Sequence, residues 1–158
     1  LLKFCITSDD IQNNFHKVEA QRRTTKFEKD IQKLFAMEEQ VQDSKYTWVS
    51  SNGGNLSMYK DMFLKVGAFD ENMGKIWGAE DLELGYRLHK KGAYFCFAKK
   101  AVNYHMTHVR ENAKDIHDKA FGYFQNKYHD ELLKKLKLYF DGSIHSLVEW
   151  RGICEDEN

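Results

Sequence analysis

The sequence of 158 residues predicts an α/β fold, and two observations lead to this prediction. The stretches 46–50, 93–98 and 101–106 are rich in aromatic and β-branched residues, a pattern typical of strands. The stretches 79–91 and 111–140 place their apolar residues at helical spacing. Because the length suits one domain with a sizeable core, we expect these strands and helices to pack together.

Residues 10–43 form the first expected element. They are rich in Gln, Lys, Glu and Asp, contain no Gly, and carry spaced apolar residues such as Phe27, Ile31 and Leu34. One or two helices fit this pattern, and a mobile loop with helical character is the alternative. The charges are those of a solvated face.

A strand, a turn and a short helix are expected next. The strand 46–50 is followed by Asn52-Gly53-Gly54-Asn55, a composition that predicts a turn. The helix spans residues 60–66 and ends at Gly67, because glycine readily adopts the conformation that closes a helix.

The second half of the chain is also expected to contain helices and strands. The helix 79–91 ends at Gly92, and the strands 93–98 and 101–106 are joined by a turn at Lys99-Lys100. The last helical stretch, 111–140, is expected to break near His129.

Composition excludes some classes of function. Lys and Arg total 24, as do Asp and Glu, so no basic excess is available for a nucleic-acid partner. No apolar run is long enough to span a membrane, and the start lacks a signal-peptide pattern. The three cysteines are far apart and lack metal spacing, which favours a reducing compartment. We therefore expect a cytoplasmic protein, with any membrane association supplied by a longer parent protein.

The run Trp77-Gly78-Ala79-Glu80-Asp81 places two carboxylates beside an aromatic residue at a helix start. On a helical wheel Asp81 shares the core-facing stripe of Leu84 and Leu88, and Glu80 lies at its edge. Glu83 lies on the opposite, polar side, where it can pair with Arg87. The negative charges of two adjacent carboxylates repel each other, which raises the pKa of one of them and helps that group to act as a general base. The simpler interpretation is that Glu80 and Asp81 are only acids of a first helical turn.

Two further groups are candidates for binding. Gly53-Gly54-Asn55 lets the backbone approach a ligand closely, although the same residues suit an ordinary hairpin turn. His105 and His108 lie at the end of a predicted strand and could bind a metal such as Mn²⁺, although structural histidines are more common than ligands. The other histidines carry no spacing signal.

Four motifs then occur in one order: Gly53-Gly54-Asn55-Leu56-Ser57, Val66-Gly67-Ala68-Phe69-Asp70-Glu71, Trp77-Gly78-Ala79-Glu80-Asp81 and Tyr104-His105. Together they resemble the C-terminal half of inverting GT-A glycosyltransferases. The similarity is to family 2 enzymes, including bacterial chondroitin-type polymerases, and to the galactosyltransferase C-terminal region, over about residues 46–110. It implies a partial GT-A fold, the C-terminal half of a nucleotide-diphospho-sugar transferase fold, with added flanking helices.

The resemblance implies a role for each matching residue. Asp81 is expected to be the general base that deprotonates the acceptor hydroxyl, and Glu80 is expected to bind acceptor hydroxyls. The implied substrate-binding residues are Gly53, Gly54, Asn55, Trp77 and Gly78. The implied donor is a nucleotide sugar, expected to be a UDP-sugar, and the implied acceptor is a carbohydrate or glycoconjugate.

A histidine after the hairpin coordinates a divalent metal in such enzymes, which here implies His105 or His108. The Tyr-His placement favours His105, which we prefer, whereas His108 followed by Arg110 fits a His-x-Arg pattern of galactosyltransferase-like enzymes. The implied cofactor of the full-length enzyme is Mn²⁺ or Mg²⁺. The oligomeric state is not indicated.

The Asp-x-Asp motif and the nucleotide-binding half that such enzymes carry upstream do not occur in this sequence, and Ser8-Asp9-Asp10 is too poorly placed to replace them. The start at Leu1 reads as the end of a buried strand. We therefore expect part of a longer enzyme, although removal of a start site would look the same and loss of donor binding is the other alternative. The expected division is 1–45 as a helical linker segment, 46–110 as the acceptor-side catalytic subdomain and 111–158 as C-terminal helices and tail.

The leading functional hypothesis is a glycosyltransferase of polysaccharide biosynthesis that transfers sugar with inversion, with the isolated chain inactive. A second hypothesis is a non-catalytic carbohydrate-binding or regulatory remnant of that fold. A third is a protein-interaction module in which residues 10–43 and 111–140 form the partner-binding surface.

Overall fold

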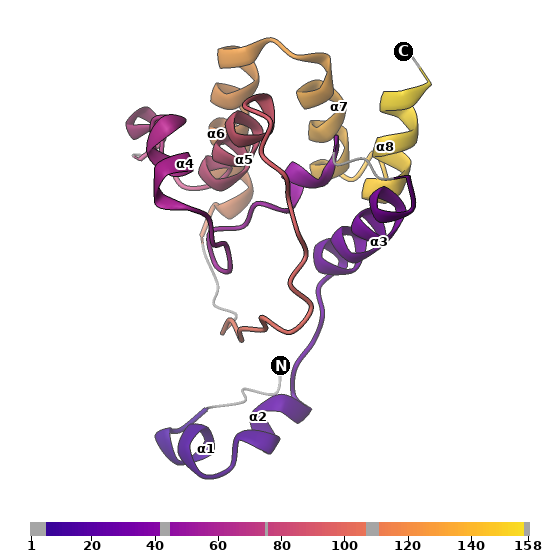
Figure 1. Cartoon of the computed structure of the whole chain (residues 1–158). Helices are drawn as coiled ribbons and strands as arrows, with labels where there is room; N and C mark the ends of the chain where they lie inside the picture. Colours follow the sequence, from indigo (N-terminus) through magenta and orange to yellow (C-terminus); the bar gives the residue numbers. More distant parts are fainter. Residues whose placement is uncertain (1–5, 42–44, 75, 107–110, 157–158) are drawn as a thin grey trace.

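The computed structural model describes residues 6–41, 45–74, 76–106 and 111–156. The later helices pack together, and the two short N-terminal helices lie apart from them (Figure 1). In chain order the helices are α1 (Ser8–Gln12), α2 (Phe15–Ala20), α3 (Lys26–Val41), η1 (Thr47–Ser50), α4 (Lys60–Lys65), η2 (Glu71–Met73), α5 (Glu80–Lys90), α6 (Ala113–Tyr128), α7 (Glu131–Phe140) and α8 (Leu147–Glu155). No helix in the described part of the chain is long and apolar enough to cross a membrane.

The prediction of an α/β fold is wrong, because the described residues contain helices and no strand. Residues 93–98 and 101–106 are irregular, although the turn between them forms and the Ala101 N–H donates to the Ala98 carbonyl at 2.9 Å. A strand is stable only when a neighbouring strand takes up its backbone hydrogen bonds. Within the described residues these two stretches find no such neighbour, so β propensity alone leaves them irregular.

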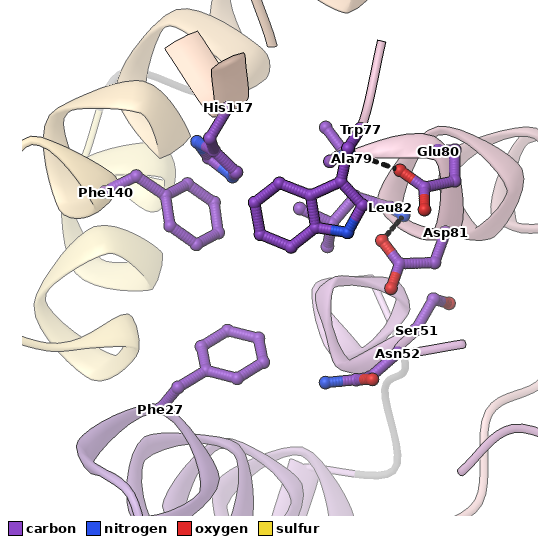
Figure 2. Close-up of a pocket in the computed structure, with 11 residues that line it drawn as sticks. Phe27, Ser51, Asn52, Trp77, Ala79, Glu80, Asp81, Leu82, His117 and Phe140 are labelled. Carbon is purple, nitrogen blue, oxygen red and sulfur yellow. Dashed lines mark hydrogen bonds between the residues drawn. The ribbon is translucent and has the colours of Figure 1, made fainter. Parts of the chain in front are cut away.

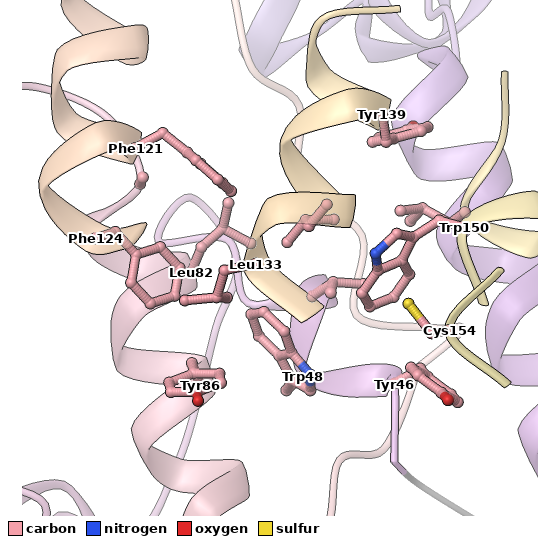
Figure 3. Packing of buried hydrophobic residues seen from close by; sticks show 14 of the residues in the cluster. Tyr46, Trp48, Leu82, Tyr86, Phe121, Phe124, Leu133, Tyr139, Trp150 and Cys154 are labelled. Carbon is pink, nitrogen blue, oxygen red and sulfur yellow. The ribbon is translucent and has the colours of Figure 1, made fainter. Parts of the chain in front are cut away.

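The stretch 46–50 was also expected as a strand and instead forms the 3₁₀ helix η1. The consecutive residues Thr47, Trp48 and Val49 are all buried, whereas a strand sends successive side chains to opposite faces. Trp48 packs edge to face against Tyr86 and Trp150, with ring centroids 5.3 and 6.3 Å apart (Figure 3). Packing on every side therefore overrides the local β preference.

The predicted helices are confirmed with small changes of boundary. Where one or two helices were expected over residues 10–43, the structure has the end of α1 together with α2 and α3, and α5 closes at Gly92, which has φ +78°. The expected break falls at His129, which has φ +50°. Asp130 then begins α7, where its side chain accepts a hydrogen bond from the Leu132 N–H at 2.9 Å.

The hydrophobic core joins α3 to the helices of the rest of the chain. Leu34 of α3, Trp48 of η1 and Leu133 of α7 are fully buried in one cluster. Trp150 of α8 lies in the same cluster (Figure 3). The core takes side chains from residues 1–45, 46–110 and 111–158 alike. The division of the chain at residues 45 and 110 stays a prediction.

The prediction that Glu83 faces solvent is wrong, whereas its pairing with Arg87 is confirmed. Glu83 is fully buried, and its carboxylate accepts hydrogen bonds from Arg87 Nη2 at 2.7 Å, Lys127 Nζ at 2.7 Å and Tyr128 OH at 2.5 Å. Lys127 also contacts Asp70 at 2.8 Å. A helical wheel assumes one buried face, but α5 is covered on several sides, so its polar side is also enclosed.

Gly85 sets the distance between α5 and η1. A Cβ atom at this position would lie 2.1 Å from Ser51 Oγ and 2.7 Å from the Trp48 carbonyl oxygen. Only glycine allows this approach. The close contact holds the segment after η1 beside the start of α5, where the candidate site lies.

Candidate functional site

The turn before α5 has an uncommon backbone. Gly78 has φ +104° and Ala79 has φ +63°, and Ala79 is the N-cap residue of α5. The left-handed conformation of a non-glycine residue costs of order 1–3 kcal/mol, and such residues often occur at functional sites. Glu80 helps to hold the turn, because its Oε2 atom accepts a hydrogen bond from the Gly78 N–H at 2.8 Å.

Asp81 lies where two sequence motifs meet. Its Oδ2 atom accepts a hydrogen bond from the Gly53 N–H at 2.9 Å, and Oδ1 accepts one from the Leu82 N–H at 2.8 Å. Burial raises the pKa of Asp81, the two N–H groups oppose this shift, and the negative charge of Glu80 adds to it. The structure thus brings Gly53 to a carboxylate with increased basicity.

A cavity of about 170 Å³ lies beside these carboxylates. One side is formed by Ser51 and Asn52 after η1 and by the run from Trp77 to Leu82. The other side is aromatic and is formed by Phe27, His117 and Phe140 from three different helices. In Figure 2 the Trp77 indole lies between the aromatic side and the carboxylates of Glu80 and Asp81.

The predicted substrate-binding residues are not all in this cavity. Trp77 and Gly78 line it, and the Trp77 side chain is 47% exposed, as a surface for a ligand requires. Gly54 and Asn55 are exposed and belong to a contact with the segment after α5. The Asn55 amide donates to the Ala101 carbonyl at 2.8 Å, and the Gly54 carbonyl accepts a hydrogen bond from Asn103.

The two predicted metal ligands differ in what the structure describes. His105 is exposed, and His108 lies outside the described residues. Among the described residues, no group of three or more His, Cys, Asp or Glu side chains could hold a metal ion. The described residues therefore do not make a metal site by themselves.

Sequence reasoning missed His117, which carries no motif or spacing signal. It lies on α6 one turn before Phe121, and its ring stacks on Phe121 with centroids 6.0 Å apart. The signal that could have found it is its place on the apolar stripe that continues through Phe121 and Phe124. Phe27 and Phe140 belong to other helices, so their approach depends on tertiary packing.

Comparisons with known proteins place this sequence in a family. A sequence model described as the N-terminal domain of galactosyltransferase matches residues 32–111, just over half of the chain. Chondroitin synthase of Escherichia coli is 43% identical over 54 residues, which is 34% of this chain and 8% of that protein. Chondroitin synthase of Pasteurella multocida (strain Pm70) is 41% identical over 63 residues, which is 40% of this chain and 6% of that protein. Validoxylamine A glucosyltransferase of Streptomyces hygroscopicus subsp. limoneus is 36% identical over 62 residues, 39% of this chain and 14% of that protein. No solved structure matches the chain.

The matched part of the chain spans only a small fraction of these curated relatives. It includes the turn from Trp77 to Asp81 and the Gly53-Gly54-Asn55 segment. The predicted resemblance to galactosyltransferases and chondroitin-type polymerases is confirmed. The chain belongs to the galactosyltransferase family whose sequence model covers residues 32–111.

Proposed function

We propose that this chain forms the acceptor side of an enzyme that transfers a sugar from a nucleotide-diphosphate donor to an acceptor hydroxyl with inversion. The observation that carries the proposal is the position of Asp81, a partly buried carboxylate at the edge of a cavity that also contains an exposed tryptophan face. Sugar rings present C–H groups that pack on aromatic faces, and their hydroxyls suit nearby carboxylates.

Asp81 acts as the general base in this proposal. As the acceptor oxygen attacks the anomeric carbon, its proton passes to Asp81. The bond from that carbon to the diphosphate oxygen breaks, and its electron pair leaves with the nucleotide diphosphate. Attack from the face opposite the leaving group inverts the configuration. The raised pKa of Asp81 makes its carboxylate a stronger base than an exposed aspartate.

Glu80 and Trp77 position the acceptor. Glu80 lines the cavity with one carboxylate oxygen engaged by the Gly78 N–H, which fixes the orientation of the other oxygen. The Trp77 indole offers the surface on which the sugar ring stacks. Holding the hydroxyl near its base removes much of the entropic cost of the reaction.

The proposal for the longer enzyme includes Mn²⁺ or Mg²⁺. If such an ion were bound in the longer enzyme, it would supply positive charge near the leaving diphosphate. His105 is the described residue that we propose as one ligand. A His105→Ala variant is expected to raise the Mn²⁺ concentration needed for half-maximal activity, with the exposed His145→Ala variant as control.

The test of the catalytic proposal is Asp81→Asn in the enzyme that carries this chain. Loss of a general base is expected to lower kcat by about 10²- to 10⁴-fold while acceptor binding persists. Asp61→Asn, at an exposed position on α4, is the matched control and is expected to keep full turnover. Unchanged turnover in Asp81→Asn would remove the catalytic role and favour a non-catalytic carbohydrate-binding module.

A further inference from the structure

The residues on the aromatic side of the cavity lie outside residues 32–111, the segment that matches the family model. His117 and Phe140 lie after residue 111, and Phe27 lies before residue 32. The carboxylate side, in contrast, lies wholly within residues 32–111. Features that distinguish the substrate of this chain from those of its relatives are therefore expected on the aromatic side.

The His117 ring is fixed by its neighbours. Its centroid lies 5.2 Å from that of Phe140 and 6.0 Å from that of Phe121. The backbone of Gly78 packs against it, so that a Cβ atom at Gly78 would lie 3.2 Å from His117 Cδ2. A ring held by three neighbours presents its nitrogens in a defined direction and loses little entropy on binding.

The ring nitrogens of His117 are available to a ligand. Within the described part of the chain, neither nitrogen makes a hydrogen bond. Burial lowers the pKa of His117, so the imidazole is neutral near pH 7 and offers one donor and one acceptor. A sugar hydroxyl also donates and accepts, which makes it a suitable partner.

The charge of the cavity restricts the ligand further. Among the described residues that line it are the carboxylates of Asp81 and Glu80 and no Lys or Arg. Cations are gathered instead at a second cavity of about 410 Å³ near the other end of α5, lined by Lys65, Arg87, Lys90 and Lys91. A negatively charged ligand in the first cavity would be repelled by the carboxylates of Asp81 and Glu80 that line it.

We propose that His117 binds a hydroxyl of an uncharged acceptor sugar stacked on Trp77, and that the cavity rejects acceptor sugars that carry a carboxylate, such as uronic acids. The sugar spans from Asp81 at one edge to His117 at the other, on either side of the indole. The proposal rests on the proposed function, because it takes this cavity as the acceptor site. His117 is thus a specificity-determining residue and takes no proton from the reacting hydroxyl.

Binding to the chain itself tests the proposal without any need for turnover. Methyl β-D-glucopyranoside and methyl β-D-glucuronide are titrated into ¹⁵N-labelled protein at pH 7, and the shifts of the Trp77 indole N–H and the Asp81 amide are followed. The uncharged glycoside is expected to shift both signals, and the glucuronide to bind at least about tenfold more weakly. Equal binding of the two glycosides would overturn the charge selection.

Variants of His117 test the hydrogen bond. His117→Phe keeps an aromatic ring and removes both nitrogens, so we expect affinity for the uncharged glycoside to fall about 3- to 10-fold. His117→Gln retains a donor and an acceptor and is expected to restore affinity to within about threefold of the original. His145→Phe, at an exposed position, is the control, and thermal unfolding of each variant shows whether it is folded.

The outcomes separate this proposal from the proposed function. If neither glycoside shifts the Trp77 and Asp81 signals, the acceptor site is wrong and both proposals fall. If the uncharged glycoside binds there but His117→Phe binds it equally well, the role of His117 is refuted while the acceptor site stands. A loss in His117→Phe that His117→Gln restores supports both.

Discussion

Replacement of Gly85 by alanine is expected to destabilise the protein even though alanine is the better helix former. In an open helix this change would raise the free energy of unfolding by about 1 kcal/mol. At Gly85 the added methyl group would lie 2.1 Å from Ser51 Oγ, 2.6 Å from Ser51 Cβ and 2.7 Å from the Trp48 carbonyl oxygen. The last of these atoms is backbone, so α5 and η1 must move apart. Overpacking of this kind costs about 1–3 kcal/mol, and the short distances place Gly85 at the upper end.

We therefore expect a net loss of about 2 kcal/mol, which for a chain of this size lowers Tm by about 4–8 °C. Gly122→Ala on α6 is the matched control, because no described atom beyond the adjacent residues and the backbone of its own helix lies within 4 Å of the added methyl group. It is expected to raise the free energy of unfolding by about 0.5–1 kcal/mol. Ser51→Ala should not rescue Gly85→Ala, since the Cβ and Trp48 contacts remain. Urea denaturation measures Gly85→Ala, Gly122→Ala and the double variant Ser51→Ala/Gly85→Ala, and equal stability of Gly85→Ala and Gly122→Ala would refute the packing argument.

Three further predictions concern charge and binding. Hydrogen bonds from Arg87, Lys127 and Tyr128 lower the pKa of Glu83 against the effect of its burial, so its contribution to stability is present above pH 4.5 and is lost as the pH falls through its lower folded-state pKa. Urea denaturation from pH 7 to pH 2 should show this loss in the original chain and a smaller loss in Glu83→Gln, and parallel curves would contradict it. Because the pKa of Asp81 is raised, kcat/KM of the enzyme that carries this chain should fall on acidification with a midpoint above 3.8, and a midpoint at or below that value would count against Asp81 as the base. Calorimetry should show weak or no binding of UDP to the chain alone with Mn²⁺ present, and tight Mn²⁺-dependent binding would show that these residues suffice for the donor.

The parts of the site that could be predicted from sequence are those formed by residues close together in the chain. The adjacent pair Glu80 and Asp81 at a helix start is visible as a local pattern, and its motif context led to the family that the comparisons confirm. The hydrogen bond between the Gly53 N–H and Asp81 was not expected from the sequence, because the two residues lie 28 positions apart in the chain. The assigned catalytic and binding roles stay predictions.

The failures have a common physical cause. Periodicity predicted one buried face for α5, yet Lys127 and Tyr128 from α6 enclose Glu83 on the face expected to be solvated. His117 was missed because its place in the cavity beside Trp77 depends on how α6 packs against the turn before α5. Both cases depend on how helices pack, which a wheel drawn for one helix does not include.

The sequence by itself determined the family and the approximate bounds of α4, α5, α6 and α7, whereas it gave no bounds for α1, α2, α3 or α8. These features depend on local rules: apolar spacing, glycine at helix ends, and the order of short motifs. Only the tertiary structure decided that 46–50 forms a buried 3₁₀ helix and that the stretches 93–98 and 101–106 remain irregular. Strand formation requires a partner strand, and burial requires neighbours from distant parts of the chain, so neither can be inferred from the residues of one segment. The same long-range packing brings the aromatic side of the cavity to the carboxylates of Glu80 and Asp81.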